Sequence, residues 1–102
     1  MIQLIDSIEQ IPKTGKVFLY KHSKTCGISK SVERSVVDFA HQHPNIPIYQ
    51  VTIQDNRQLS QTIEQIYNIT HESPQMIVLE DNKPVDHTSH FSIDQKWLEQ
   101  HL

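Results

Sequence analysis

The sequence contains a single cysteine, Cys26, among 102 residues. One cysteine cannot build an intramolecular disulfide framework, and it leaves no partner for a CxxC redox pair or a zinc site of paired cysteines. A chain of this kind is typical of a reducing compartment, so we expect a cytoplasmic protein.

Long apolar runs are also missing. The longest, residues 17–20 and 76–79, are far shorter than the roughly 20 residues needed to span a bilayer. The opening residues 1–6 lack the basic start of a signal peptide. We therefore expect no membrane association. A chain of 102 residues can bury one core and not two, which predicts a single domain over residues 1–102.

The charge is distributed unevenly, although the formal net charge is only −3. The segment between residues 13 and 34 has one acid, Glu33, and these cations: Lys13, Lys16, Lys21, Lys24, Lys30 and Arg34. If they gather around the sulfur of Cys26, they will lower its pKa and attract an anionic thiol. Each lysine taken alone is more simply a solvated surface residue. The acidic balance, without a basic stripe interleaved with aromatics, argues against nucleic-acid binding.

Apolar spacing and turn residues predict eight elements in the order α-β-α-β-α-β-β-α. They are a helix over Ile2–Gln10, a strand buried on both faces over Lys16–His22, a helix from Cys26 to about His43, a strand over Ile48–Ile53, a helix over Asn56–Tyr67, strands over Met76–Glu80 and Pro84–Thr88 around the turn Asp81–Lys83, and a last helix over Ile93–His101 capped by Ser92. Strand-helix-strand units imply parallel pairing, and the hairpin adds antiparallel strands. The prediction is an α/β, thioredoxin-like fold with a central mixed four-stranded sheet flanked by helices.

Cys26 stands where the predicted strand gives way to a helix. This position puts a sulfur near unpaired backbone N–H groups and the positive end of the helix dipole, which favours thiolate over thiol. We expect a pKa for Cys26 below the value of about 8.5 for a free cysteine.

Three segments have a recognisable sequence: Tyr20–Ser23 leading into Thr25-Cys26-Gly27-Ile28-Ser29, then Ser73-Pro74-Gln75, and then His87–Phe91. On these residues, and over nearly its whole length, the chain resembles the monothiol bacilliredoxins of the thioredoxin superfamily. The usual family signature is Thr-Cys-Pro-Ile-Ser, and Gly27 replaces its proline. This change moves the motif toward the Cys-Gly-Phe-Ser of monothiol glutaredoxins, some of which hold an iron–sulfur cluster with glutathione.

The resemblance implies a thiol-disulfide oxidoreductase that removes bacillithiol from S-bacillithiolated proteins through a mixed disulfide of Cys26 with bacillithiol. Bacillithiol is then a co-substrate, and no bound cofactor is expected. The implied partners are bacillithiolated client proteins, bacillithiol itself and a regenerating thiol or reductase. We expect a monomer. Two other functions stay open: an iron–sulfur cluster carrier like the monothiol glutaredoxins, and a non-catalytic thioredoxin-like binding module.

Around the catalytic Cys26, the resemblance and the residue types together give the candidate substrate-binding residues Lys21, Lys24, Thr25, Gly27, Ser29, Ser73 and Pro74. The Ser29 hydroxyl could hydrogen-bond the thiolate, or Ser29 is an ordinary helix-start residue. Pro74, as the cis-proline of the family, would leave the Ser73 backbone free to pair with an extended substrate; the alternative is a rigid turn. Lys21 and Lys24 are candidate contacts for the malate carboxylates of bacillithiol.

The remaining candidate roles have plain alternatives. Thr25 shapes the approach to the sulfur or is only a loop residue, and Gly27 permits close approach of backbone or ligand. His22, four residues before Cys26, either stabilises the thiolate or points into solvent. The seven histidines lack the spacing and the carboxylates of a metal site, so no metal is predicted.

Overall fold

Strand β2 (Lys16–His22) lies at the centre of the sheet. The computed structural model describes residues 2–25 and 27–102. Residues 17–20 are at most 1% exposed, because β2 has a strand on each side and helices over both faces. The strand has the predicted bounds. Its consecutive apolar residues are explained, as predicted, by the burial of both of its faces.

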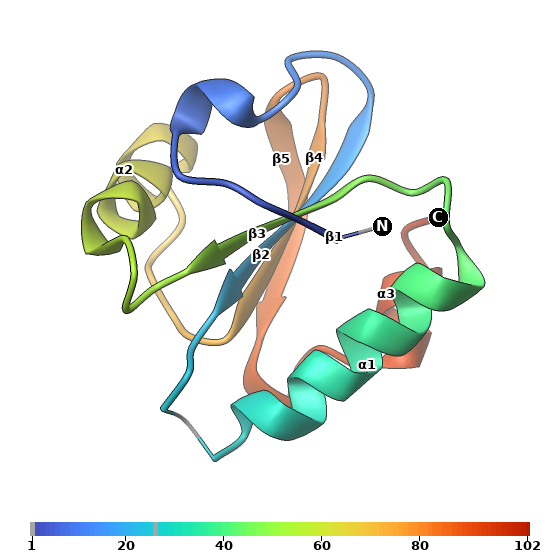
Figure 1. Cartoon of the computed structure of the whole chain (residues 1–102). Coiled ribbons are helices and arrows are strands. Elements are labelled where there is room, and N and C mark those ends of the chain that lie inside the picture. Colours follow the sequence, from blue (N-terminus) through green and yellow to red (C-terminus); the bar gives the residue numbers. More distant parts are fainter. Residues whose placement is uncertain (1, 26) are drawn as a thin grey trace.

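The sheet has five strands in the order β1-β3-β2-β4-β5 (Figure 1). The other strands are β1 (Ile2–Leu4), β3 (Ile48–Thr52), β4 (Gln75–Glu80) and β5 (Lys83–Ser89). Strands β1, β3 and β2 are parallel, whereas β4 and β5 are antiparallel to their neighbours. The mixed α/β sheet is confirmed, and the predicted four strands become five.

The N-terminal segment accounts for the additional strand, and the predicted helix over Ile2–Gln10 was wrong. Ile2–Leu4 pairs in parallel with Ile48–Gln50 at the edge of the sheet. A 3₁₀ turn, η1 (Ile8–Gln10), follows and is capped by Ser7, whose hydroxyl accepts the backbone N–H of Glu9. Apolar residues at positions 2, 5 and 8 imitate helical spacing, but pairing with β3 satisfies the backbone of this short segment.

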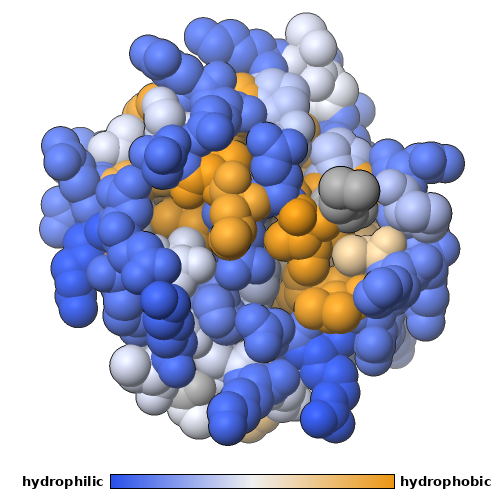
Figure 2. Space-filling model, in the orientation of Figure 1, coloured by the Kyte–Doolittle hydropathy of each residue, from blue (hydrophilic) through white to orange (hydrophobic). Residues whose placement is uncertain are grey.

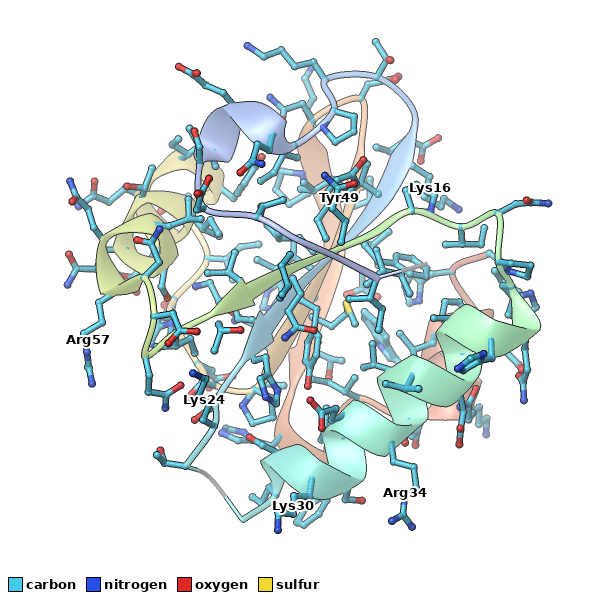
Figure 3. The ribbon with its side chains drawn as sticks, viewed as in Figure 1. Lys16, Lys24, Lys30, Arg34, Tyr49 and Arg57 are labelled. Atoms are coloured by element: carbon cyan, nitrogen blue, oxygen red, sulfur yellow. The ribbon has the colours of Figure 1, made fainter. Side chains whose placement is uncertain are left out.

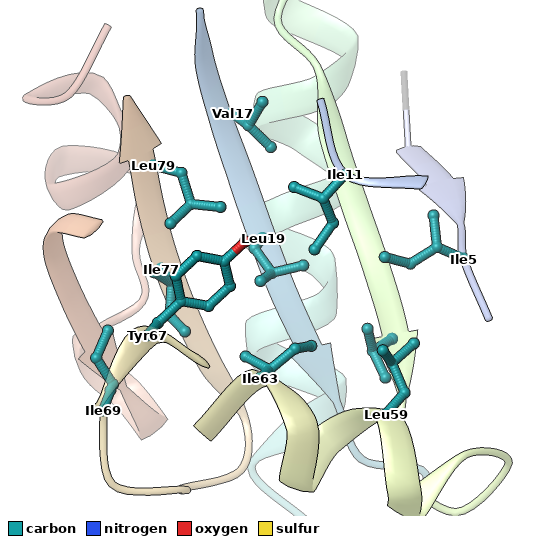
Figure 4. Packing of buried hydrophobic residues seen from close by; sticks show 11 residues of the cluster. Ile5, Ile11, Val17, Leu19, Leu59, Ile63, Tyr67, Ile69, Ile77 and Leu79 are labelled. Atoms are coloured by element: carbon teal, nitrogen blue, oxygen red, sulfur yellow. The ribbon is translucent and has the colours of Figure 1, made fainter. Parts of the chain in front are cut away.

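The helices form a layer on each face of the sheet (Figure 1). Helices α1 (Ser29–Gln42) and α3 (Gln95–Glu99), with the 3₁₀ turn η2 (His90–Ser92), cover one face, and α2 (Arg57–Tyr67) with η1 covers the other. Alternate residues of β2 therefore belong to different cores: Phe18 and Tyr20 pack under α1, and Val17 and Leu19 pack under α2. Figure 4 shows the α2 side of this arrangement.

The last helix is shorter than the predicted range Ile93–His101. It begins after Asp94, whose carboxylate accepts the backbone N–H of Trp97 at 2.9 Å. Ser92, the predicted cap, instead belongs to η2. An aspartate is as good an N-cap as a serine, so residue types alone could not choose between them.

The hairpin between β4 and β5 turns on Asp81 and Asn82, which have positive φ angles of 51° and 65°. The Asn82 side chain also accepts a hydrogen bond of 2.7 Å from the Tyr67 hydroxyl, which ties the turn to the end of α2. Further along the hairpin, Val78 pairs with Asp86 and Leu79 with Pro84, so Val85 is an extra residue in a β-bulge.

Asn82 provides a test of this turn. Asn82→Gly keeps the left-handed conformation and loses only the hydrogen bond, which should cost about 1 kcal/mol of unfolding free energy. Asn82→Ala loses the hydrogen bond and also adopts an unfavourable positive φ, for a total of about 2 kcal/mol. Urea unfolding of both variants measures the difference. Equal losses would mean that the positive φ contributes nothing.

The surface is polar with scattered apolar patches, as Figure 2 shows for one face. On the side where α1 and the edge strand β1 meet, a cavity of about 380 Å³ is lined by Ile2, Val37, Ala40, His41 and Pro44. Within residues 2–25 and 27–102, no helix has both the length and the apolar character needed to cross a bilayer.

Candidate functional site

The candidate site lies where β2 ends and α1 begins. Cys26 itself lies outside the described residues, but its neighbours Thr25 and Gly27 are exposed. Helix α1 starts at Ser29, and the N-cap position is Ile28, whose apolar side chain supplies no capping oxygen. The first backbone N–H groups of α1 are thus not capped by the residue that precedes them, and they carry the positive end of the helix dipole.

Ser29, three residues after Cys26 in the sequence, has a buried polar side chain. It is only 2% exposed, and its hydroxyl has no hydrogen-bond partner among the described residues. Burying a hydroxyl without a hydrogen-bond partner costs free energy. Ser29 follows Cys26 by three residues in the sequence, which keeps the predicted hydrogen bond to the thiolate open.

The Ser73–Pro74 peptide bond is cis, as the resemblance implied. These residues directly precede β4, which is antiparallel to β2 with Lys21 opposite Gln75. Extending this register places Pro74 opposite His22, so Ser73 and Pro74 lie at the end of the sheet from which the Cys26 segment leaves. The Pro74 carbonyl accepts the backbone N–H of His90 at 3.0 Å, which joins this loop to the end of β5.

Lys24 and Thr25 are both tied to the β3–α2 loop. The Thr25 hydroxyl accepts a hydrogen bond from the amide of Gln54, and the Lys24 backbone N–H donates to the oxygen of the same amide. The ammonium of Lys24 forms an exposed ion pair of 2.9 Å with Asp55. Thr25 is therefore more than an unattached loop residue, and Lys24 has a partner already.

Gly27 is not required by the conformation of the chain. A Cβ atom at this position would meet no heavy atom within 4 Å, and the φ angle of Gly27 is not in the left-handed region. None of the described atoms of the protein comes so close to Gly27 that a side chain would be excluded there. Approach of a ligand stays a prediction.

Lys21 is inside the protein, although lysine is usually a surface residue. Its side chain is 0% exposed, and its ammonium lies 3.2 Å from Nδ1 of His71. Burial lowers the pKa of Lys21 to about 8, an effect that the nearby Glu64 carboxylate opposes. Contact between Lys21 and a substrate carboxylate stays a prediction, and it requires the covering side chains to move.

His71 links Lys21 to α2. Its Nδ1 is also 3.2 Å from the hydroxyl of Ser60, and its backbone N–H donates to the Glu64 carboxylate at 2.6 Å. Because an ammonium can only donate, Nδ1 accepts from protonated Lys21 and carries no proton. Burial, and then the charge of Lys21, lower the pKa of His71, which keeps the imidazole neutral. A cavity of about 250 Å³ beside this cluster is lined by Ile53, Arg57, Ser60, Gln61, Glu64 and His71.

His22 does not point freely into solvent, since its side chain is only 12% exposed. Its Nδ1 lies 3.1 Å from the Tyr20 hydroxyl, and its Nε2 lies 3.4 Å from the Glu33 carboxylate of α1. Burial, followed by the charge of Glu33, raises the pKa of Tyr20, so its hydroxyl stays protonated and can donate. Tyr20, His22 and Glu33 thus connect the end of β2 to the start of α1.

The cations of residues 13–34 do not all gather at one place, so that prediction was wrong in part. The Lys16 ammonium donates to the carbonyl of His101 at the opposite end of β2. Figure 3 shows Lys16 far from Lys24 and Lys30, with Arg34 further along α1. Lys24 and Lys30 are the exposed cations that flank the Cys26 segment most closely in sequence. Within the described ranges, no three histidine, aspartate or glutamate side chains come together as a metal site would require.

Comparison with known families decides the assignment. Residues 2–98 match the family described as monothiol bacilliredoxin BrxC. The chain belongs to the monothiol bacilliredoxin family. The one cysteine of this bacilliredoxin agrees with the monothiol description, and family and fold together support a role as a thiol-disulfide oxidoreductase.

Solved structures support the same fold. A thioredoxin-fold protein described as a candidate oxidoreductase is 30% identical to this bacilliredoxin, with a TM-score of 0.89 over 98% of this chain and 92% of that one. Thioredoxin of Malassezia sympodialis is 17% identical, with a TM-score of 0.78 over 99% and 90% of the two chains. Thioredoxin of Trypanosoma brucei brucei is 18% identical, with a TM-score of 0.77 over 99% and 87%. The two thioredoxins establish the fold alone.

The sequence did not predict several residues that structure the site of this bacilliredoxin. Gln54, Ser60 and His71 are polar residues that show no periodic pattern and belong to no recognised motif. Their roles follow from tertiary contacts with Thr25 and Lys21, which no local signal announces.

Proposed function

We propose that this protein removes bacillithiol from mixed disulfides on cytoplasmic proteins, with Cys26 as the nucleophile. The proposal is carried by the match to the monothiol bacilliredoxin family over residues 2–98 in a chain with one cysteine. The client proteins and bacillithiol are its partners, and no bound cofactor takes part.

The proposed reaction is a thiol-disulfide exchange. The Cys26 thiolate attacks the bacillithiol sulfur, a new S–S bond forms between them, and the bond to the client sulfur breaks. The client leaves as a thiolate and takes up a proton from solvent. One disulfide replaces another, so no external oxidant or reductant is needed in this step.

The arrangement around the cysteine supports this chemistry. The N–H groups at the start of α1, which Ile28 does not cap, and the buried Ser29 hydroxyl, which has no partner among residues 2–25 and 27–102, would offer hydrogen bonds and a positive dipole to a thiolate. The cis Ser73–Pro74 loop lies at the same end of the sheet, where the Ser73 backbone would pair with an extended client segment. Gly27 adds no side chain next to Cys26 in the sequence, and the space around its own Cα is open.

A carboxylate contact is best assigned to Lys24. Its ion pair with Asp55 is exposed, with 55% and 61% of the two side chains accessible, and exposed pairs contribute little free energy. Lys24 can therefore exchange Asp55 for a malate carboxylate of bacillithiol at small cost. Lys21 remains a second candidate, although it is buried.

Regeneration requires another molecule. Because the chain has no second cysteine, the Cys26 mixed disulfide cannot be resolved internally. A second bacillithiol or a thiol reductase must attack it and take the bacillithiol away as a new disulfide. The protein works as a monomer in this scheme, since one cysteine and one client complete the exchange.

Intact-mass spectrometry tests the proposal. Wild type and Cys26→Ala are each mixed with a bacillithiolated model protein and, separately, with a glutathionylated one. We expect a bacillithiol adduct on wild type alone, formed much faster than the glutathione adduct. No adduct from either substrate would overturn the proposal. The Cys-Gly-Ile-Ser motif would then make anaerobic iron–sulfur reconstitution the next experiment.

A further inference from the structure

The amide of Gln54 makes three hydrogen bonds to the segment that leads into Cys26. Its Nε2 donates to the hydroxyls of Ser23 at 3.0 Å and Thr25 at 3.1 Å. Its Oε1 accepts the backbone N–H of Lys24 at 3.0 Å. One side chain from the β3–α2 loop therefore holds the three consecutive residues 23–25, and the next residue in the sequence is Cys26.

The chemistry of these partners fixes the orientation of the amide. The Lys24 N–H can only donate, so it must face Oε1, and the NH₂ group must then face the two hydroxyls. Both N–H bonds of Gln54 are used in this orientation. Ser23, whose hydroxyl accepts one of these hydrogen bonds, is only 4% exposed. Water therefore does not easily replace the Gln54 amide at this contact.

The loop that carries Gln54 is itself well anchored. The backbone N–H groups of Asp55 and Asn56 both donate to the Thr52 carbonyl at the end of β3, each at 3.1 Å. The Asn56 side chain caps α2 through the N–H of Leu59 and donates to the carbonyl of Asp6. Gln54 is thus presented by a rigid support, as a group that positions another segment must be.

We propose that Gln54 is a positioning residue that fixes residues 23–25 and so aims the Cys26 thiol at the disulfide it attacks. The proposal rests on Cys26 being the nucleophile, as proposed above. Thiol-disulfide exchange requires the attacking sulfur to approach along the axis of the S–S bond. If the segment that carries the thiol could rotate freely, the thiol would often point away from this axis. A misplacement of about 1 Å can slow an enzyme by about a hundredfold.

The test compares Gln54→Met with wild type and with Gln58→Met. Methionine matches glutamine in length and makes none of the three hydrogen bonds. Gln58 is exposed on the first turn of α2, and no hydrogen bond of its side chain is seen among the described residues, so it controls for the same chemical change nearby. Thr25→Val removes one hydrogen bond without changing the size of the side chain.

Two rates separate positioning from thiol acidity. In Gln54→Met, we expect bacillithiol transfer from the model protein to slow by about ten- to a hundredfold. Alkylation of Cys26 by iodoacetamide needs no oriented site, and above the thiol pKa its rate should change by less than about twofold. Thr25→Val should slow the transfer less, and Gln58→Met should leave both rates unchanged.

Amide exchange of Lys24, measured by NMR, reports the contact directly. It should accelerate in Gln54→Met and not in Gln58→Met. Unchanged transfer in Gln54→Met, or an equal fall in transfer and alkylation, would overturn the proposal. If wild type transfers no bacillithiol, the proposed substrate is wrong, and exchange with a small aromatic disulfide still compares the variants.

Discussion

The stability of the wild type relative to Lys21→Met should rise by about 3 kcal/mol between about pH 8 and pH 10.5. The folded protein lowers the pKa of Lys21 from 10.5 to about 8, mainly because the ammonium is buried. A shift of this size corresponds to about 3 kcal/mol that the protonated lysine costs the folded state.

The sign follows from proton uptake. Between about pH 8 and pH 10.5 the unfolded chain binds a proton at Lys21 that the folded chain has lost. The wild-type stability therefore gains with pH in this window relative to the variant. Below pH 8 the penalty is fully present, and above pH 10.5 both states hold a neutral amine.

Urea unfolding at pH 7, 8, 9 and 10 measures the difference between the two proteins. Lys30→Met is the matched control, because Lys30 is exposed on α1 and its removal should give no such pH dependence. If the Lys21→Met and wild-type curves stay parallel, the ammonium of Lys21 is not penalised by the fold.

Phe39→Ala should cost about 3 to 5 kcal/mol of unfolding free energy. Phe39 of α1 is 0% exposed, and its ring centroid lies 5.3 Å from that of Phe18 in β2. Its removal leaves a cavity between the helix and the central strand that rigid strand neighbours cannot fill. For a domain with a total stability of roughly 5 to 15 kcal/mol, this is a large fraction.

Phe39→Leu is the comparison that isolates the cavity. It keeps most of the apolar volume and should cost about 1.5 kcal/mol or less. Chemical denaturation with both variants at one temperature gives the two values. A loss below about 1 kcal/mol for Phe39→Ala would show that α1 does not depend on this contact for its position on the sheet.

The sequence correctly predicted those helices and strands in which the pattern of apolar residues matches the faces that are buried in the folded protein. Strand β2 is marked by consecutive apolar residues, and the helices α1 and α2 have clear apolar periodicity and end close to Pro44 and Asn68. The first strand, β1, was mispredicted as part of a helix, because a strand of three residues is too short to show an alternation of apolar and polar side chains. Its strand conformation depends on pairing with β3, which lies more than 40 residues away.

At the site, local pattern located the cysteine, and the family resemblance located the proline loop. The role of Gln54 was not predictable, because a glutamine's partners depend on which loops the fold brings together. Lys21 could have been recognised as buried: it follows four residues that are covered on both faces, in the same central strand. The general preference of lysine for the surface concealed this.

The bulge at Val85 has a consequence for how this sheet ends. Strand β5 is the outer strand beside β4, and most of its side chains are exposed. Pro84 has no N–H to offer a further strand, Lys83 and Asp86 place charges along it, and the extra residue Val85 twists it out of line. Edge strands built in this way resist pairing with strands of other molecules. At this edge the chain is protected against aggregation by β-sheet extension.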